Sequence, residues 1–265
     1  MSETDAVLLT VEGPVATIAL NRPKALNALN VELAEALLAV TRKVAADPAV
    51  RVVVLTGTGD NFMAGGDIRM FAGLLEKAPQ ERVAVFSEMV RKINPIVEAF
   101  RAMDKPIVAS VRGAVAGFGL SLVMATDLAI AADNAFFTLA YRHIGLTPDG
   151  GASYFLPRTV PMKVAMELAL LGDRFDAEAA RGHGIVNRVV PLDQLDAATG
   201  KLCRMLAAGP ADVMARTKRL LLAAVETPLS RHLEAEADSF GTCAGQPDFA
   251  EGVRAFLEKR PAKFA

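Results

Sequence analysis

The sequence predicts an α/β fold built as a coiled stack of similar strand–strand–helix turns, followed by a helical C-terminal region. Short runs rich in β-branched residues alternate with longer helical patterns up to about residue 190. The strand–strand–helix unit recurs loosely over residues 6–46, 51–103 and 106–131. From Leu192 onward the strand pattern stops and nearly every segment has helical periodicity.

Local patterns predict the individual elements. Residues 6–11 and 15–20 read as two strands on either side of a Gly13-Pro14 turn, which is typical of a hairpin. Asn30 is a suitable N-cap for a helix that Asp47-Pro48 ends. The further expected elements are a strand over 51–56, a helix over 81–103, a strand over 106–111, a helix starting near Gly119, strands over 127–132 and 135–139, helices over 161–171 and 177–181, and a strand over 185–190.

Two regions follow from this pattern. We expect a spiral core over residues 1–197 and a helical C-terminal region over residues 198–265. No Ser- or Gly-rich linker separates them, so the helical region is expected to pack on another surface. Its apolar residues Leu220, Leu221 and Val225 can belong either to the core or to a contact between subunits.

Composition excludes several classes of protein. Twenty-nine basic and 30 acidic side chains give a net charge of −1, and there is no Trp, so nucleic acid is not an expected partner. Cys203 and Cys243 have no metal-site spacing, and the histidines are far apart, so no metal is expected. No signal peptide or membrane-length apolar run is visible, and we expect a cytoplasmic protein.

Two glycine-rich segments share one design. Residues 52–57 form a buried-type strand that leads to 61–67, and residues 106–113 lead in the same way to 114–119. Glycine lets a ligand approach the backbone, and a helix start leaves N–H groups unpaired. Two such turns facing each other can place two N–H groups on one developing oxyanion. The alternative is that both are ordinary tight turns, which are common at strand ends.

Four ordered segments together resemble the enoyl-CoA hydratase/isomerase (crotonase) family. The segments are 21–29, 62–68, 113–119 and 184–191, and they span nearly the whole chain. This resemblance implies a crotonase-like spiral with a C-terminal oligomerisation region, assembled as homotrimers or as hexamers made of two trimers. It also implies an acyl-CoA thioester substrate, with coenzyme A as part of the substrate and no separate cofactor.

The resemblance also assigns catalytic positions. The oxyanion-hole donors fall on the backbone N–H groups of Gly66 and Phe118, where the phenylalanine replaces the family's usual glycine and is expected to narrow the acyl pocket. The two glutamates of the hydratases fall on Ser121 and Tyr141, which are poor bases near neutral pH. Tyr141 can line the acyl pocket, donate a hydrogen bond or belong to the packed core.

One carboxylate remains in this region. Asp149 belongs to a Pro-Asp-Gly-Gly segment similar to that of acyl-CoA isomerases of the family, including the phenylacetate-pathway ring isomerase. Such a similarity implies that Asp149 moves the proton. Pro-Asp-Gly is also a standard turn sequence, so a purely structural aspartate is the alternative.

The resemblance assigns substrate-binding positions as well. Near the C-terminus, Phe256 and Lys259 are expected to reach the nucleotide bound by a neighbouring subunit, and Arg260 lies beside them in the sequence. The alternative is that residues 259–263 form a solvated tail. The expected substrate-binding residues are Lys24, Ala25, Leu26, Ala64, Asp67, Ile68, Ser121, Tyr141, Phe256 and Lys259.

Four activities remain open at this point. An isomerase would use Asp149 as its acid and base. A hydratase would add water with a molecule held by Asp149, Ser121 or Tyr141. A hydrolytic or dehalogenating enzyme would use Asp149 as a nucleophile, and a non-catalytic acyl-CoA binder would need none of these groups.

Overall fold

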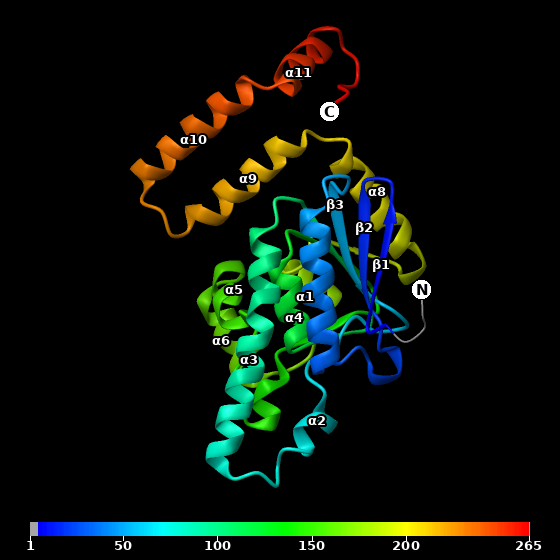
Figure 1. The fold of residues 1–265 in the computed structure, drawn as a ribbon, viewed down its shortest axis with the longest axis vertical. Helices are drawn as coiled ribbons and strands as arrows, with labels where there is room; N and C mark the ends of the chain where they lie inside the picture. Colours follow the sequence, from blue (N-terminus) through cyan, green and yellow to red (C-terminus); the bar gives the residue numbers. More distant parts are fainter. Residues whose placement is uncertain (1–4, 265) are drawn as a thin grey trace.

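The computed structural model describes residues 5–264, which form two sheets surrounded by helices (Figure 1). The larger sheet has the strand order β1-β2-β3-β4-β6-β9, and the smaller has the order β5-β7-β8. The strands are β1 (Val7–Glu12), β2 (Val15–Leu20), β3 (Val52–Gly57), β4 (Ile107–Val111), β5 (Ala114–Ala116), β6 (Leu128–Ala132), β7 (Phe136–Thr138), β8 (Phe175–Asp176) and β9 (Arg188–Val190).

The strand pairing explains the repeated turns. β1 and β2 form the expected antiparallel hairpin, and β2, β3, β4, β6 and β9 then pair in parallel. After β4 the chain passes directly into β5 of the smaller sheet, and after β6 it passes into β7, which pairs in parallel with β5. The predicted α/β stack of similar turns is therefore confirmed.

Helices return the chain between strands and then form the C-terminal region. The α-helices are α1 (Val31–Ala46), α2 (Ile68–Ala72), α3 (Pro79–Ala102), α4 (Phe118–Ala125), α5 (Ala152–Thr159), α6 (Met162–Leu171), α7 (Ala177–Gly182), α8 (Leu195–Ala207), α9 (Ala211–Ala224), α10 (Leu229–Ala244) and α11 (Pro247–Leu257). Three short 3-10 helices are η1 (Pro23–Ala25), η2 (Ala140–Ile144) and η3 (Leu192–Gln194). No helix within residues 5–264 has the length and apolarity that crossing a bilayer requires.

The larger sheet is covered on both faces. α1 and α3 pack against each other, and α1 also packs on the β1–β2 hairpin. Asn30 caps α1 as predicted, because its side chain accepts a hydrogen bond from the Leu33 N–H at 2.9 Å. On the opposite face, Leu195 and Leu202 of α8 join a buried cluster with residues of β3, β4 and β6. The predicted boundary between residues 197 and 198 thus falls inside a helix that packs on the sheet.

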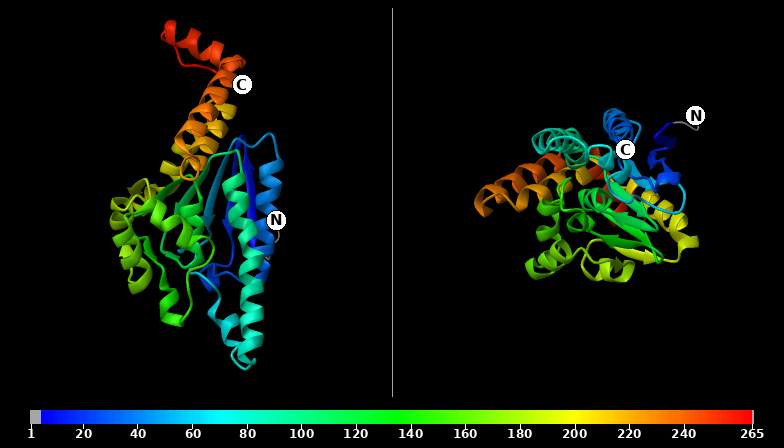
Figure 2. Two further views of the ribbon diagram at one scale, coloured as in Figure 1. Left: turned by 90° about the vertical axis from the view of Figure 1, so that its left-hand side faces the viewer. Right: turned by 90° about the horizontal axis from the view of Figure 1, so that it is seen from below.

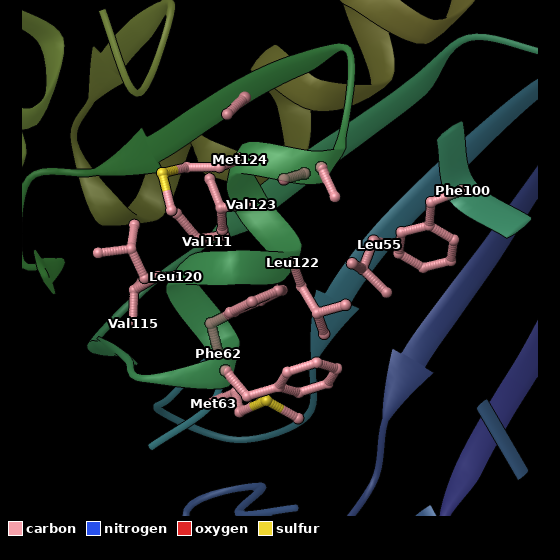
Figure 3. Packing of buried hydrophobic residues seen from close by; sticks show 14 of the residues in the cluster. Leu55, Phe62, Met63, Phe100, Val111, Val115, Leu120, Leu122, Val123 and Met124 are labelled. Atoms are coloured by element: carbon pink, nitrogen blue, oxygen red, sulfur yellow. The ribbon is translucent and has the colours of Figure 1, made fainter. Parts of the chain in front are cut away.

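α4 lies in the centre of the molecule. All eight of its residues are buried, so the helix is apolar all round rather than amphipathic. Figure 3 shows Leu120, Leu122 and Val123 pointing from this helix toward different parts of the surrounding core. The position of the first residue of α4, Phe118, is therefore fixed by packing on every side.

The last three helices form a separate arm. Figures 1 and 2 show that α9, α10 and α11, called here the C-terminal arm, extend beyond the body of the molecule. Within the arm only Ala215 and Ala255 are buried, while Phe240 is 78% exposed and Leu229 is 73% exposed. In the C-terminal region α8 packs on the core, and α9 is joined to the body by ion pairs from Lys218 to Asp127 at 2.8 Å and from Arg219 to Asp104 at 2.7 Å.

The structure differs from the sequence predictions in short elements. Residues 114–116, expected within a glycine-rich turn, form β5, and residues 185–187 are not part of β9. The sequence pattern did not predict α2, α5 or β8. α2 has five residues and β8 has two, too few to show a period, and α5 contains Pro157, which usually argues against a helix.

Candidate active site

The two glycine-rich turns face each other. A parallel bridge joins Met63 to Val115, with the Met63 N–H donating to Ala114 at 2.9 Å and the Met63 carbonyl accepting from Ala116 at 2.9 Å. A Cβ atom on Gly117 would lie 3.4 Å from the Cα of Gly65. The two backbones are thus in van der Waals contact, as the arrangement predicted from sequence requires.

Each turn offers one unpaired backbone donor. Among the hydrogen bonds of residues 5–264, none is donated by the N–H of Gly66 or of Phe118. Phe118 opens α4, where helix geometry leaves the N–H free, and Gly117 before it has φ +51° and ψ −120°. Gly66 and Phe118 line the same cavity. This geometry suits a carbonyl oxygen that gains negative charge.

The cavity beside these donors has a volume of about 930 Å³. Much of its wall is apolar, and the rings of Phe71 and Phe86 meet edge to face within it, 5.0 Å apart. A Cβ atom on Gly66 would lie 2.7 Å from Cζ of Phe71, so only glycine leaves that ring in place. The charged or titratable residues in the wall are Glu35, Arg91, Lys92, Tyr141, His143 and Asp149.

Asp149 is half-buried in the wall of this cavity. Tyr141 Oη donates a hydrogen bond to its Oδ1 at 2.7 Å, and Ser121 Oγ donates to its main-chain carbonyl at 2.9 Å. Burial raises the pKa of the Asp149 carboxyl, and the Tyr141 hydroxyl offsets part of that increase. A carboxyl group with a raised pKa is suited both to accept and to return a proton near neutral pH.

Tyr141 connects Asp149 to the turn that carries Gly117. It belongs to η2, and its hydroxyl would lie 3.7 Å from a Cβ atom on Gly117. Burial and the charge of Asp149 raise the pKa of its phenol, which therefore stays protonated and acts as a donor. Of the roles that the sequence left open for Tyr141, the structure shows two, because its hydroxyl donates a hydrogen bond and the residue lines the cavity.

Ser121 has a different environment. It is fully buried in α4, and it is not among the residues that line the cavity. Its hydroxyl is bonded to the main chain of Asp149. The predicted direct contact of Ser121 with substrate therefore finds no support in this arrangement.

Phe118 is also placed differently from expectation. Its side chain is 2% exposed, and a Cβ atom on Gly150 would lie 2.4 Å from the Phe118 ring. The ring thus supports the loop that carries Asp149. Phe118 also lines the cavity, so it can shape the pocket both directly and through the position of that loop.

The N-terminal residues predicted to bind coenzyme A lie together. The Ala64 N–H donates to the Leu26 carbonyl at 3.0 Å, which places the segment 24–26 beside the segment 64–68. Asp67 caps α2 through the Arg69 N–H and forms an ion pair with Arg22 at 3.0 Å. Burial raises the pKa of the Asp67 carboxyl, but the hydrogen bond and charge of Arg22 together with the N–H groups of Arg69 and Met70 outweigh it and leave the pKa below its ordinary value.

Arg22 and the aromatic pair Phe71 and Phe86 were not predicted from the sequence as parts of the site. Arg22 belongs to the recognised segment 21–29, so its charge was visible, but its partner lies 45 residues away. Phe71 and Phe86 come from α2 and α3, and no spacing rule relates them. Only the folded chain brings these residues to one site.

The C-terminal residues predicted to bind coenzyme A lie elsewhere. Phe256 is 83% exposed and lines an apolar groove between the helices of the C-terminal arm. Lys259 follows α11, outside the residues that line the Asp149 cavity. Within one chain Phe256 and Lys259 therefore do not line the cavity that contains Asp149. Their expected contact with the nucleotide bound by a neighbouring subunit stays a prediction.

Comparison with known proteins identifies the class. Residues 10–265 match the family described as enoyl-CoA hydratase/isomerase. The chain is 36% identical over 264 residues to the crotonyl-CoA hydratase of Syntrophomonas wolfei, with 97% of each chain covered. It is 34% identical over 258 residues to the 1,2-epoxyphenylacetyl-CoA isomerase of Escherichia coli, again with 97% of each covered. The chain belongs to the enoyl-CoA hydratase/isomerase family.

Solved structures show the same relationship. The crystal structure of an enoyl-CoA hydratase from Polaromonas sp. JS666 superposes with a TM-score of 0.92 at 32% identity, covering 98% of this chain and 99% of that one. The predicted crotonase-like fold is confirmed. The chain is an acyl-CoA enzyme of this family, whose similar members include both hydratases and isomerases.

Proposed function

We propose that this enzyme isomerises an enoyl-CoA thioester, with Asp149 as the acid and base. The observation that carries the proposal is the carboxylate of Asp149 in the cavity wall, linked through Tyr141 to the turn that presents the Phe118 N–H. Ser121 and Tyr141, which align with the glutamates of the hydratases, carry hydroxyl groups. The other carboxylate of the cavity wall belongs to Glu35, which is exposed on α1.

The proposed reaction is a proton shuttle. The N–H groups of Gly66 and Phe118 bind the thioester oxygen and stabilise the negative charge that develops there. Asp149 forms an O–H bond with a proton from the acyl chain, and the electron pair of the broken C–H bond enters the conjugated enolate. Asp149 then returns the proton to a different carbon, so the product has the composition of the substrate.

Substrate binding and assembly complete the proposal. Lys24, Ala25 and Leu26 would contact the coenzyme A moiety together with Ala64 and the 67–68 segment. Phe256 and Lys259 would reach the nucleotide bound by a neighbouring subunit of a homotrimer, or of a hexamer made of two trimers. The exposed apolar residues of the C-terminal arm support a contact between subunits, since large apolar patches commonly mark interfaces.

Hydration is the second candidate. It is favoured by the similarity to the crotonyl-CoA hydratase of Syntrophomonas wolfei. In this case Asp149 would have to orient a water molecule without a second carboxylate beside it. The product would then be heavier than the substrate by one water.

Product mass decides between these activities. Wild type, Asp149→Asn and the exposed control Asp193→Asn are incubated with short, medium and aryl-substituted 2-enoyl- and 3-enoyl-CoA, and the products are separated and weighed. We expect isomers of unchanged mass from wild type and Asp193→Asn, and a loss of about 100-fold or more with Asp149→Asn. Gain of water would instead support the hydratase.

Three further outcomes would reject the proposal. Full turnover by Asp149→Asn would remove Asp149 from the mechanism. Heavy oxygen from solvent appearing in the Asp149 carboxylate over several turnovers would support a nucleophile. Tight binding without any turnover would support an acyl-CoA binder.

A further inference from the structure

Two hydroxyl groups from different elements meet at one aspartate. Tyr141 comes from η2 and Ser121 from α4, and they are 20 residues apart in the sequence. Both donate a hydrogen bond to Asp149. These are the positions at which the family's hydratases carry their two glutamates, so their contacts here show what replaces those carboxylates.

The two bonds act on different parts of Asp149. Tyr141 holds one carboxylate oxygen, Oδ1, at 2.7 Å. Ser121 holds the main-chain carbonyl of the same residue at 2.9 Å. Among the hydrogen bonds of residues 5–264, the one that another residue donates to this carboxylate ends on Oδ1, so Oδ2 is available for a substrate proton.

The groups that make these bonds are themselves fixed. Ser121 is fully buried in the central helix, and its neighbours on α4 are packed on all sides. Tyr141 packs against the hydrophobic core. An aspartate in a Gly-rich loop is otherwise free to rotate, so rigid anchors are needed to place it within the geometry that proton transfer requires.

We infer that Tyr141 and Ser121 are positioning residues for Asp149. Tyr141 fixes the carboxylate by one oxygen and leaves the other for the substrate, while Ser121 fixes the backbone beneath it. The catalytic consequence rests on the proposed role of Asp149 as acid and base. Neither hydroxyl exchanges protons with the substrate, and neither holds a water molecule for addition.

The surroundings of Asp149 make Tyr141 the dominant polar influence on it. From η2 it faces the Tyr141 hydroxyl, and from α4 it faces the uncharged Ser121. The other charged or titratable groups of the cavity wall are Glu35 on α1, Arg91 and Lys92 on α3, and His143 on η2. The main effects on the pKa of Asp149 are burial, which raises it, and the Tyr141 bond, which lowers it.

The test removes each hydroxyl separately. Tyr141→Phe is compared with Tyr154→Phe, which removes the only other phenol of the chain from an exposed position on α5. Ser121→Ala is compared with Ser110→Ala, which removes a buried hydroxyl that bonds Thr199, and neither of these two residues lines the cavity.

Kinetics provide the first readout, using the enoyl-CoA that wild type converts fastest. We expect Tyr141→Phe to lower kcat by about 10- to 100-fold, and Ser121→Ala by about 2- to 10-fold, with little change in KM. The acidic limb of kcat/KM against pH should move to higher pH in Tyr141→Phe, because the lost bond stabilised the ionised carboxylate. The two control variants should behave as wild type in both respects.

A titration of Asp149 itself provides the second readout and needs no turnover. The ¹³Cγ resonance of Asp149, assigned by its absence in Asp149→Asn, is followed with pH in aspartate-labelled protein. Its midpoint should move to higher pH in Tyr141→Phe and remain in place in Tyr154→Phe. An unmoved midpoint with unchanged kcat would overturn the inference even if Asp149→Asn is inactive.

Two other results are equally decisive. If Asp149→Asn keeps full turnover while Tyr141→Phe loses it, Tyr141 acts on the substrate directly, and both the inference and the proposed function are wrong. If Tyr141→Phe shifts the midpoint but wild type adds water, Tyr141 positions Asp149 for hydration, and only the proposed isomerisation fails. Thermal unfolding and acyl-CoA binding of each variant establish that the folded protein is being compared.

Discussion

Replacing Gly150 by alanine should displace the loop that carries Asp149, and a second substitution should partly restore it. Gly150 follows Asp149 and has φ +56°, which is unfavourable for any residue with a Cβ atom. The new Cβ would also lie 2.4 Å from Cδ2 of Phe118 and 3.2 Å from Cβ of Ser121. Two separate costs, one conformational and one steric, therefore apply at this position.

The structure separates these costs. The left-handed backbone accounts for about 1–2 kcal/mol. Displacing a buried ring from a packed core adds about 1–3 kcal/mol, so Gly150→Ala should lower the free energy of unfolding by about 2–5 kcal/mol. Gly145 provides the matched control, because it has φ +68° and nothing lies within 4 Å of its added Cβ. Gly145→Ala should show only the conformational cost.

Urea unfolding of a double-mutant cycle measures the steric part. Phe118→Leu shortens the ring side chain and keeps the backbone N–H of residue 118, so the double variant should recover about 1–3 kcal/mol relative to the sum of the single changes. Turnover should fall in Gly150→Ala and recover partly in the double variant, since Asp149 moves with the loop. Strict additivity, or equal effects at Gly145 and Gly150, would refute the steric argument.

Three further predictions concern charge, cavity and assembly. Because burial raises the pKa of Asp149, its ionised form destabilises the native state above that pKa. Asp149→Asn should therefore increase the free energy of unfolding at pH 7. In urea unfolding this gain should vanish as the pH falls below the ordinary carboxyl pKa of about 4. A gain that stays constant with pH would show that the ionisation of Asp149 is not its cause. Phe71→Ala should raise the ratio of kcat/KM for bulky acyl groups to kcat/KM for short ones by about tenfold or more. An unchanged ratio would show that the Phe71 ring does not limit the size of the cavity. Phe240→Glu should reduce the mass seen in sedimentation velocity, because Phe240 is 78% exposed on the arm, and equal masses for variant and wild type would remove α10 from the interface.

The long, strongly patterned elements of the fold could be predicted from the sequence. The β1–β2 hairpin, α1 with its Asn30 cap, and the buried β3 and β4 all follow from local periodicity and turn residues. α2 and β8 could not be predicted, because neither is long enough to establish a period, and α5 contains Pro157. Their existence depends on the surfaces that the rest of the chain provides.

The candidate site was predictable in its backbone and less so in its side chains. The glycine spacing anticipated the facing turns at Gly65 and Gly117, because that arrangement is a property of the main chain. The role of Ser121 could not be predicted from its position in the sequence, because only the folded structure shows that its hydroxyl donates a hydrogen bond to the main-chain carbonyl of Asp149. The same applies to Phe71, whose contact with Gly66 joins separate elements.

The central helix ties the stability of the core to the geometry of the reaction. In the proposed mechanism Phe118 supplies an N–H for the oxyanion, and its ring supports Gly150, so one residue would fix both the donor and the loop that carries Asp149. Ser121, one turn further along α4, holds the same loop through Asp149. A change that loosens α4 should consequently displace the thioester oxygen and the proton acceptor together. Mildly destabilising substitutions in α4 are therefore expected to reduce kcat even where the protein still folds.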